Sequence, residues 1–202
     1  METRIVPLHQ ARQELAACKV VYRIPRYREL FAPAEAAGEV DGFALLRSPV
    51  LAGAPEYARL LGAVRALQRA GLVHRRIFTA KGLLGDFSAA FEVRTAFARA
   101  RELFHEAGGE GPVDLRLLGA AAQHDLTRPV LEEVCGPAAA LYEKYLGAPR
   151  EVVLRGLLAG WRTWDLHAVA QLFPGRAPSS LDPDPAKRPT VDELFAEALT
   201  AA

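Results

Sequence analysis

Apolar residues recur at spacings of three and four from residue 55 onward, and this period predicts helices. The clearest stripe precedes Gly71 and consists of Tyr57, Leu60, Leu61, Val64 and Leu67. Gly71 stands where a helix C-cap belongs, because glycine readily adopts the left-handed conformation that ends many helices. We therefore expect a helix that ends at this glycine.

Further helices are predicted over residues 88–107, 112–123, 127–146 with a break at Gly136, and 149–173. Gly156 and Gly160 lie inside the last of these. Each glycine costs about 1 kcal/mol relative to alanine in a helix, so the pair indicates close packing or a break. After a loop over residues 174–189, Thr190 and Glu193 form a capping box that opens the final helix.

The N-terminal quarter has a different pattern. Residues 18–25 alternate and are rich in β-branched and aromatic side chains, so they predict a strand that Pro25 ends. A second strand is predicted over residues 42–49, between Gly42 and Pro49. These two strands are the only β element that the pattern indicates.

Helices are expected on either side of the first strand, after Pro7 within residues 4–17 and over residues 26–37. Together the segments predict a mainly α fold with a small N-terminal β element. We expect a small α/β region over residues 1–54 and a helical domain over residues 55–202, joined in one compact unit.

Composition limits the classes of function. The 202 residues suit one domain, and half of them are hydrophobic, which is enough for a core. The net charge is +1, so nothing favours nucleic acid or an anionic membrane as a partner. No stretch approaches the ~20 apolar residues that span a bilayer, and the N-terminus leads into no secretory apolar run. We therefore expect a cytoplasmic protein without membrane or nucleic-acid partners.

Two rarer residue types add to this picture. Arginine supplies most of the positive charge and asparagine does not occur, a usage typical of a GC-rich or heat-adapted bacterium. Cys18 and Cys135 are the only cysteines. In a chain with a large core, two distant cysteines are expected to be reduced, buried thiols rather than a disulfide.

Three short segments carry a family resemblance. They are residues 66–75 (ALQRAGLVHR), residues 85–91 (GDFSAAF) and residues 182–190 (DPDPAKRPT). In this order they resemble landmarks of the protein-kinase C-lobe: the catalytic loop with its His-Arg pair, the metal-binding Asp-Phe-Gly segment, and a late Arg-Pro-Thr turn. The resemblance implies a reduced kinase-like fold.

The resemblance also implies that the chemistry is lost. Kinases need an aspartate that accepts the substrate's proton, and an asparagine and a second aspartate that hold Mg²⁺. Arg76 stands at the position of the first aspartate and Lys81 at that of the asparagine, whereas Asp86 matches the second aspartate. A guanidinium or ammonium group offers no lone pair to a proton or a metal. The chain is therefore expected to be pseudokinase-like, without the groups that phosphoryl transfer needs.

A nucleotide site, if one persists, is implied at Lys19 and Asp86. Lys19, at one end of the first predicted strand, would contact phosphates and pair with Glu29 or Glu35, while Asp86 would hold Mg²⁺. His74 and Asp86 should then lie close together beside a small sheet that carries Lys19. No glycine-rich phosphate loop precedes Lys19, so ATP and Mg²⁺ remain only an option and no cofactor is our main expectation.

His124 and Asp125 admit a different chemistry. They follow an apolar run and resemble the His-Asp step of HD-domain phosphohydrolases, in which both side chains bind a divalent metal. His74 or His105 would supply the earlier histidine and Asp165 the late aspartate. The kinase resemblance instead places Asp125 near an aspartate that braces the catalytic loop, and a plain helix C-terminus also suits His124.

Three functions follow from these patterns. The first is a non-catalytic, kinase-like binding or regulatory module with a protein partner. The second is a metal-dependent HD-type phosphohydrolase centred on His124 and Asp125. The third is a helical adaptor or scaffold without a ligand, in which Asp86 is simply the N-cap of the helix predicted from Ser88.

Overall fold

The computed structural model describes residues 1–49, 56–77, 83–104 and 111–200. The chain divides into two compact units: unit 1 comprises Met1–Glu92 and Val191–Ala202, and unit 2 comprises Val93–Thr190. The boundary expected at residue 54 falls outside the described residues. The mainly α fold with a small N-terminal sheet is confirmed.

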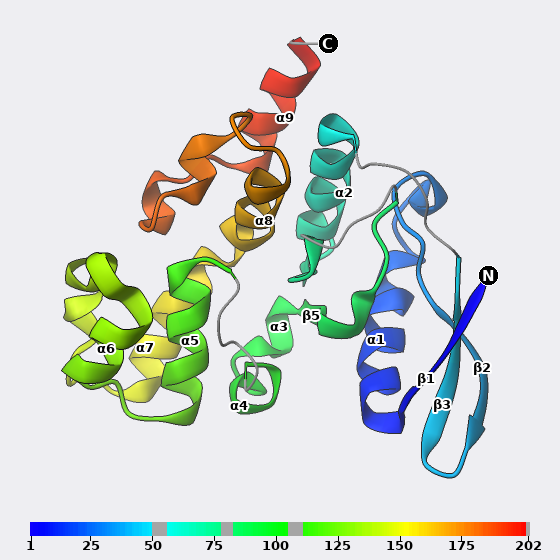
Figure 1. Cartoon of the computed structure of the whole chain (residues 1–202), viewed down its shortest axis with the longest axis horizontal. Helices are drawn as coiled ribbons and strands as arrows, with labels where there is room; N and C mark the ends of the chain where they lie inside the picture. The colour runs from blue at the N-terminus through cyan, green and yellow to red at the C-terminus, as the bar shows by residue number, and fades with distance from the viewer. Residues whose placement is uncertain (50–55, 78–82, 105–110, 201–202) are drawn as a thin grey trace. The chain divides into compact units, whose positions relative to one another are not determined.

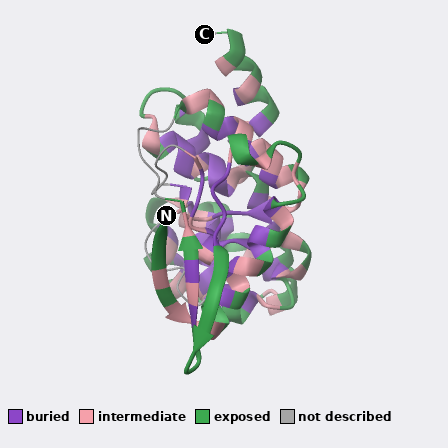
Figure 2. Cartoon of the chain, turned by 90° about the vertical axis from the view of Figure 1, so that its right-hand side faces the viewer, coloured by how far each residue is buried: buried purple, intermediate pink, exposed green. Residues whose placement is uncertain are grey.

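Unit 1 contains a three-stranded antiparallel sheet of strand order β1-β3-β2 (Figure 1). The strands are β1 (Glu2–Pro7), β2 (Glu35–Val40) and β3 (Phe43–Ser48). Asp41 and Gly42 join β2 to β3 with φ of 49° and 81°, which is the backbone that a two-residue type I′ turn requires. All of β2 is exposed, whereas buried and exposed residues alternate along β3 (Figure 2).

Helix α1 (Leu8–Val21) packs against all three strands. Its buried side chains are Ala11, Glu14, Ala17, Cys18 and Val21. Their spacing of three, three, one and three continues one helical face to the end of α1. The strand predicted over residues 18–25 is therefore wrong, because burial of Cys18 and Val21 against the sheet outweighs the β propensity of the local sequence.

The helix expected over residues 26–37 is also wrong. Only a 3-10 turn, η1 (Tyr27–Glu29), forms there, and β2 follows it. The helix expected within residues 4–17 does begin after Pro7, but residues 2–7 belong to β1. The strand predicted over residues 42–49 is confirmed as β3.

Helix α2 (Tyr57–Arg69) confirms the apolar stripe, since Leu60, Leu61, Val64 and Leu67 are buried. Gly71 follows it with φ of 69°, as a helix terminus in the left-handed region requires. Helix α9 (Val191–Thr200) packs on α2. Two short strands, β4 (Leu72–Val73) and β5 (Phe91–Glu92), pair antiparallel and complete unit 1.

Unit 2 is built from short helices. They are α3 (Val93–Ala96), α4 (Ala100–Leu103), α5 (Val113–Gln123), α6 (Arg128–Cys135), α7 (Arg150–Leu158) and α8 (Trp164–Leu172). The 3-10 segments η4 (Gly136–Tyr145), η5 (Ala159–Thr163), η6 (Pro178–Leu181) and η7 (Pro185–Lys187) connect or follow them. Helix α5 packs on α4, α6 and α7, so α5 is the central helix of the unit.

Two of the predicted long helices are interrupted. Residues 88–104 contain the end of η3 (Phe87–Ala89), β5, α3 and α4. The helix predicted over residues 149–173 divides into α7, η5 and α8. Its break includes Gly160, where an added Cβ would lie 2.5 Å from Asp114 Oδ2. The close approach of a buried carboxylate explains why glycine is required there.

A buried arginine links the parts of unit 2. Arg188 Nη2 donates to Asp114 Oδ1 at 2.8 Å, and Trp164 Nε1 donates to Asp114 Oδ2 at 2.6 Å. The guanidinium also donates to Thr163 Oγ1 at 2.9 Å and to the carbonyl of Asp182 at 2.6 Å. The Arg188 cation therefore bonds to groups in α5, in η5 and in the segment before α9, and Asp114 extends the network to α8 through Trp164.

The remaining sequence expectations concern the cysteines and the membrane. Cys18 and Cys135 are both buried and free, as predicted. Burial raises the pKa of the Cys18 thiol to about 12 and that of Cys135 to about 11, so both stay protonated at neutral pH. None of the described helices is both long and apolar enough to cross a membrane.

Replacing Arg188 should destabilise unit 2 strongly. Arg188→Met leaves the Asp114 carboxylate buried without its cation, and breaking such a pair typically costs about 3–5 kcal/mol. Urea denaturation should show this loss, and Arg188→Met combined with Asp114→Asn should recover part of it because no unpaired charge remains. The exposed neighbour gives the control, Lys187→Met, which should change stability by less than about 0.5 kcal/mol. A loss below about 1 kcal/mol for Arg188→Met would contradict the prediction.

Candidate functional site

The candidate site lies in unit 1, where α1 packs against the turn η3. The segment that follows β4 brings in His74 and Arg76, and the segment that precedes β5 brings in Asp86 and Ser88. The antiparallel pairing of β4 with β5 holds these two segments side by side. Residues that are about ten positions apart in sequence therefore meet at one place.

His74 is fully buried and connects the two segments. Its Nε2 lies 2.7 Å from the Gly85 carbonyl oxygen, and the backbone N–H of Arg76 donates to its Nδ1 at 3.2 Å. A carbonyl can only accept, so Nε2 carries the proton and Nδ1 carries the lone pair. The bond that Nδ1 accepts thus requires the neutral imidazole, because a protonated ring has no lone pair at that nitrogen. Burial lowers the pKa of His74 to about 4 and outweighs the opposing effects of Gly85 and Asp86.

Phe87 fixes the position of the histidine ring. Its side chain is fully buried, and its ring centroid lies 4.8 Å from that of His74 and 6.1 Å from that of Phe31. A bridge between Phe31 and Leu84 joins the same segment to the residues before β2. The floor of the site is therefore apolar and tightly packed.

Asp86 and Arg76 form the polar part of the site. Asp86 Oδ1 accepts from the Ser88 hydroxyl at 2.6 Å, and Arg76 Nη1 lies 3.5 Å from Asp86 Oδ2. Arg76 also donates to Ser88 Oγ at 3.2 Å. Burial raises the pKa of Asp86, but the bonds from Ser88 and the charge of Arg76 outweigh burial and lower it. The Asp86 carboxylate is thus ionised and already engaged at both oxygens.

A second ion pair lies beside this one. Arg4 on β1 pairs with Glu14 on α1, and the Glu14 side chain is only 1% exposed. Burial raises the pKa of Glu14, and the charge of Arg4 offsets this only in part. Asp86 and Arg76 also act on Glu14 electrostatically. Two cations and two carboxylates therefore interact within one small region.

The backbone is strained at two residues of the site. Arg75 has φ of 70° and Asp86 has φ of 54°, a region that residues other than glycine enter rarely. The Asp86 side chain accepts from the Ser88 N–H, which caps η3 and helps an aspartate to hold this conformation. The interpretation of Asp86 as an N-cap is thus confirmed, although it caps a 3-10 turn.

The structure brings together some of the residues singled out in the sequence. His74 and Asp86 lie close together, as predicted. The placement of Lys19 at the end of a strand is wrong, because Lys19 is exposed in the last turn of α1. Glu29 pairs with Arg26 at 2.7 Å, and Glu35 lies in β2. Lys81 falls outside the described residues.

His124 and Asp125 lie in unit 2 at the end of α5, and both are exposed. The side chain of Asp125 is 93% exposed and pairs with Arg150 at 3.3 Å. Asp165 is buried in α8, and His105 lies outside the described residues. Within the described part of the chain, no three His, Cys, Asp or Glu residues form a group that could hold a metal ion.

Arg4 and Glu14 were missed in the sequence. The sequence pattern places Arg4 in a helical segment, although the β-branched residues Thr3, Ile5 and Val6 before Pro7 suit an edge strand. Glu14 lies on the buried, otherwise apolar face of α1. A single glutamate at such a position does not by itself indicate a functional site. Only the antiparallel pairing of β1 with β3 places Arg4 over the buried face of α1.

The sequence matches no protein-family model, and no curated protein matches it significantly.

Burial of neutral His74 predicts a loss of stability in acid. The pKa of His74 is near 4 in the folded chain and about 6.5 when unfolded, so between these values the unfolded chain binds more protons. The contribution of His74 to the free energy of unfolding is fully present above pH 6.5. It falls as the pH drops toward 4, by at most about 1.4 kcal/mol per pH unit. Urea denaturation from pH 7 to pH 4.5 should show this slope.

Two variants isolate the contribution of His74. His74→Gln should be less stable at pH 7 and should lose stability less steeply in acid. His124→Gln, at an exposed histidine, should keep the slope of the unaltered chain. Equal slopes for His74→Gln and the unaltered chain would contradict the assignment.

Proposed function

We propose that the chain is a non-catalytic, pseudokinase-like binding or regulatory module whose partner is another protein. The observation that carries the proposal is the Arg76–Asp86 pair. Arg76 Nη1 lies 3.5 Å from Oδ2 of Asp86, the carboxylate that matches the metal-binding aspartate of kinases. Phosphoryl transfer needs a proton acceptor and a metal ligand at these two positions.

The strand-to-helix ion pair supports the kinase-like frame. Active kinases pair a strand lysine with a glutamate on the following helix, close to the metal-binding aspartate. Arg4 on β1 and Glu14 on the following helix α1 likewise form an ion pair between a strand and the next helix. The cation here is an arginine instead of a lysine. Its planar guanidinium contacts a phosphate with a different geometry from a lysine ammonium.

The surroundings of Asp86 do not fit a Mg²⁺ ion. Its Oδ1 accepts from Ser88, and its Oδ2 faces the Arg76 guanidinium. A metal ion there would be repelled by that guanidinium, and Arg76 has no lone pair with which to take a proton. We therefore assign no phosphoryl-transfer step to this chain.

Exposed apolar side chains support a protein partner. Ile5, Val40 and Phe43 lie on the sheet of unit 1 and are 70%, 59% and 48% exposed. Val40 and Phe43 are partners across the β2–β3 hairpin, so the exposed apolar area is not scattered singly. Side chains of this kind are the ones that protein–protein contacts bury.

The proposal predicts that the purified chain transfers no phosphate. Incubation with radiolabelled ATP, Mg²⁺ and a mixture of acceptor proteins should leave every protein unlabelled. Label on any protein that disappears in the Asp86→Asn variant would overturn the proposal, because it would show a functioning metal-binding aspartate.

A thermal-shift measurement tests the role of Arg76 directly. Mg²⁺ added with ATP should not stabilise the unaltered chain beyond ATP alone. Arg76→Gln should gain a Mg²⁺-dependent stabilisation, of about 1.4 kcal/mol when Mg²⁺–ATP is at ten times Kd. The exposed Arg23 gives the matched control, Arg23→Gln, which should behave as the unaltered chain. An equal Mg²⁺ response in all three proteins would contradict the proposal.

A further inference from the structure

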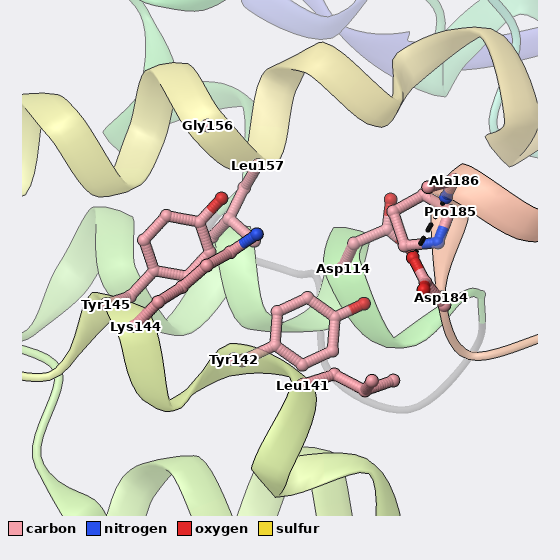
Figure 3. Close-up of a pocket in the computed structure, with 10 residues that line it drawn as sticks. All are labelled: Asp114, Leu141, Tyr142, Lys144, Tyr145, Gly156, Leu157, Asp184, Pro185 and Ala186. Atoms are coloured by element: carbon pink, nitrogen blue, oxygen red, sulfur yellow. Dashed lines mark hydrogen bonds between the residues drawn. The ribbon is translucent and has the colours of Figure 1, made fainter.

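A cavity of about 170 Å³ opens in unit 2 between η4, α7 and the segment that contains η7 (Figure 3). It is separate from the site in unit 1 and does not depend on the function proposed for that site. Its lining mixes apolar side chains, chiefly Leu141, Leu157 and Pro185, with two tyrosines and with charged groups. An engineered cavity of about 150 Å³ is large enough for benzene, so this one fits a small organic molecule.

The wall beside α7 depends on a glycine. The Tyr145 phenol lies against Gly156, where an added Cβ would collide with its hydroxyl group. Tyr142 donates to the Pro183 carbonyl at 2.7 Å. Burial raises the pKa of both phenols, so they are neutral hydrogen-bonding groups at physiological pH. The cavity is thus lined by apolar side chains and charged groups together with two neutral tyrosines.

Opposite charges face each other across this pocket. The Lys144 ammonium lies over the Tyr145 ring, 5.2 Å from its centroid. Asp184 lies on the opposite side, beside Pro185 (Figure 3). Its Oδ1 accepts from the Ala186 N–H at 3.0 Å, which fixes the carboxylate at the start of η7 and leaves its other oxygen outside that bond.

Asp114 also borders the pocket, but its charge is already compensated. Both of its oxygens accept strong hydrogen bonds, from Arg188 and from Trp164. A ligand cation would gain little from it, because the Arg188 guanidinium is fully buried at the same place. The charges that a ligand can use are therefore those of Lys144 and Asp184.

We propose that this pocket binds a small zwitterion, an amino acid with its ammonium and carboxylate groups at opposite ends of a short aliphatic chain. The carboxylate pairs with Lys144 and the ammonium with Asp184, while the aliphatic body lies against Leu157 and the Tyr142 ring. Charge-assisted hydrogen bonds at both ends supply the selectivity, and the limited volume excludes drug-sized ligands.

Calorimetric titration of the full chain with a matched set of ligands tests the proposal. γ-Aminobutyrate and δ-aminovalerate carry both charges at opposite ends, whereas butylamine and butyrate carry one each. We expect either zwitterion to bind at least about tenfold more tightly than either singly charged compound. Leucine, whose two charges are adjacent, should bind as weakly as the singly charged compounds. Failure of both zwitterions to bind, or equal affinity across the set, would overturn the proposal.

Charge-removing variants test the two ends separately. Lys144→Met should reduce zwitterion affinity by at least about tenfold while leaving butylamine binding unchanged. Asp184→Asn keeps an acceptor for the Ala186 N–H. It should also reduce zwitterion affinity by at least about tenfold, while leaving butyrate binding unchanged. The matched controls are Lys19→Met and Asp125→Asn, at exposed residues that do not line the pocket, and they should bind as the unaltered chain does.

Thermal unfolding of each variant shows whether the fold is kept. A variant that melts as the unaltered chain does, yet binds the zwitterion undiminished, would contradict the assigned charge contacts. Should Asp184→Asn lower the melting temperature, Leu141→Trp provides a second test. Leu141 is 40% exposed at the rim of the pocket, and a larger ring there should block binding without altering the core.

Discussion

A carboxylate that is buried in a folded chain must be paired, and this constraint organises both units of the protein. In unit 1, Glu14 is 1% exposed and is matched by Arg4 from the edge strand of the sheet. In unit 2, Asp114 is equally buried and is matched by Arg188, from far along the sequence. An unpaired charge at either place would cost several kcal/mol, so each pair fixes which distant segments meet.

The two pairs differ in what surrounds them. Arg188 donates its hydrogen bonds to Asp114, Thr163 and backbone carbonyls. Its role is therefore structural, and it holds the segments around the pocket in place. Arg4 and Glu14 lie in the electrostatic reach of Arg76 and Asp86. Arg76 and Asp86 are partly exposed, and the backbone at this site is strained at Arg75 and Asp86. Strain of this kind is more common at functional sites than in simple packing.

The groups of the candidate site are engaged with one another. His74 is buried as the neutral imidazole and both of its nitrogens are engaged. Asp86 is engaged by Ser88 and Arg76, so the site offers no free base that the described residues would supply. These mutual contacts are why we propose recognition rather than catalysis for this site. The pocket of unit 2 has the opposite character, with space and two usable charges.

The sequence by itself determined the elements whose burial follows one local period. Helix α2 follows from spacings of three and four and its end from Gly71, whereas the proximity of His74 to Asp86 is implied by the resemblance of their segments to kinase landmarks. Tertiary structure decided the rest. Residues 18–21 are helical because Cys18 and Val21 extend the buried face of α1, although their neighbours favour strands. The break at Gly160 exists because Asp114, from another helix, occupies the space of a side chain. Arg4 became a site residue only through the pairing of β1 with β3, and no local pattern can report a partner that lies ten or more residues away.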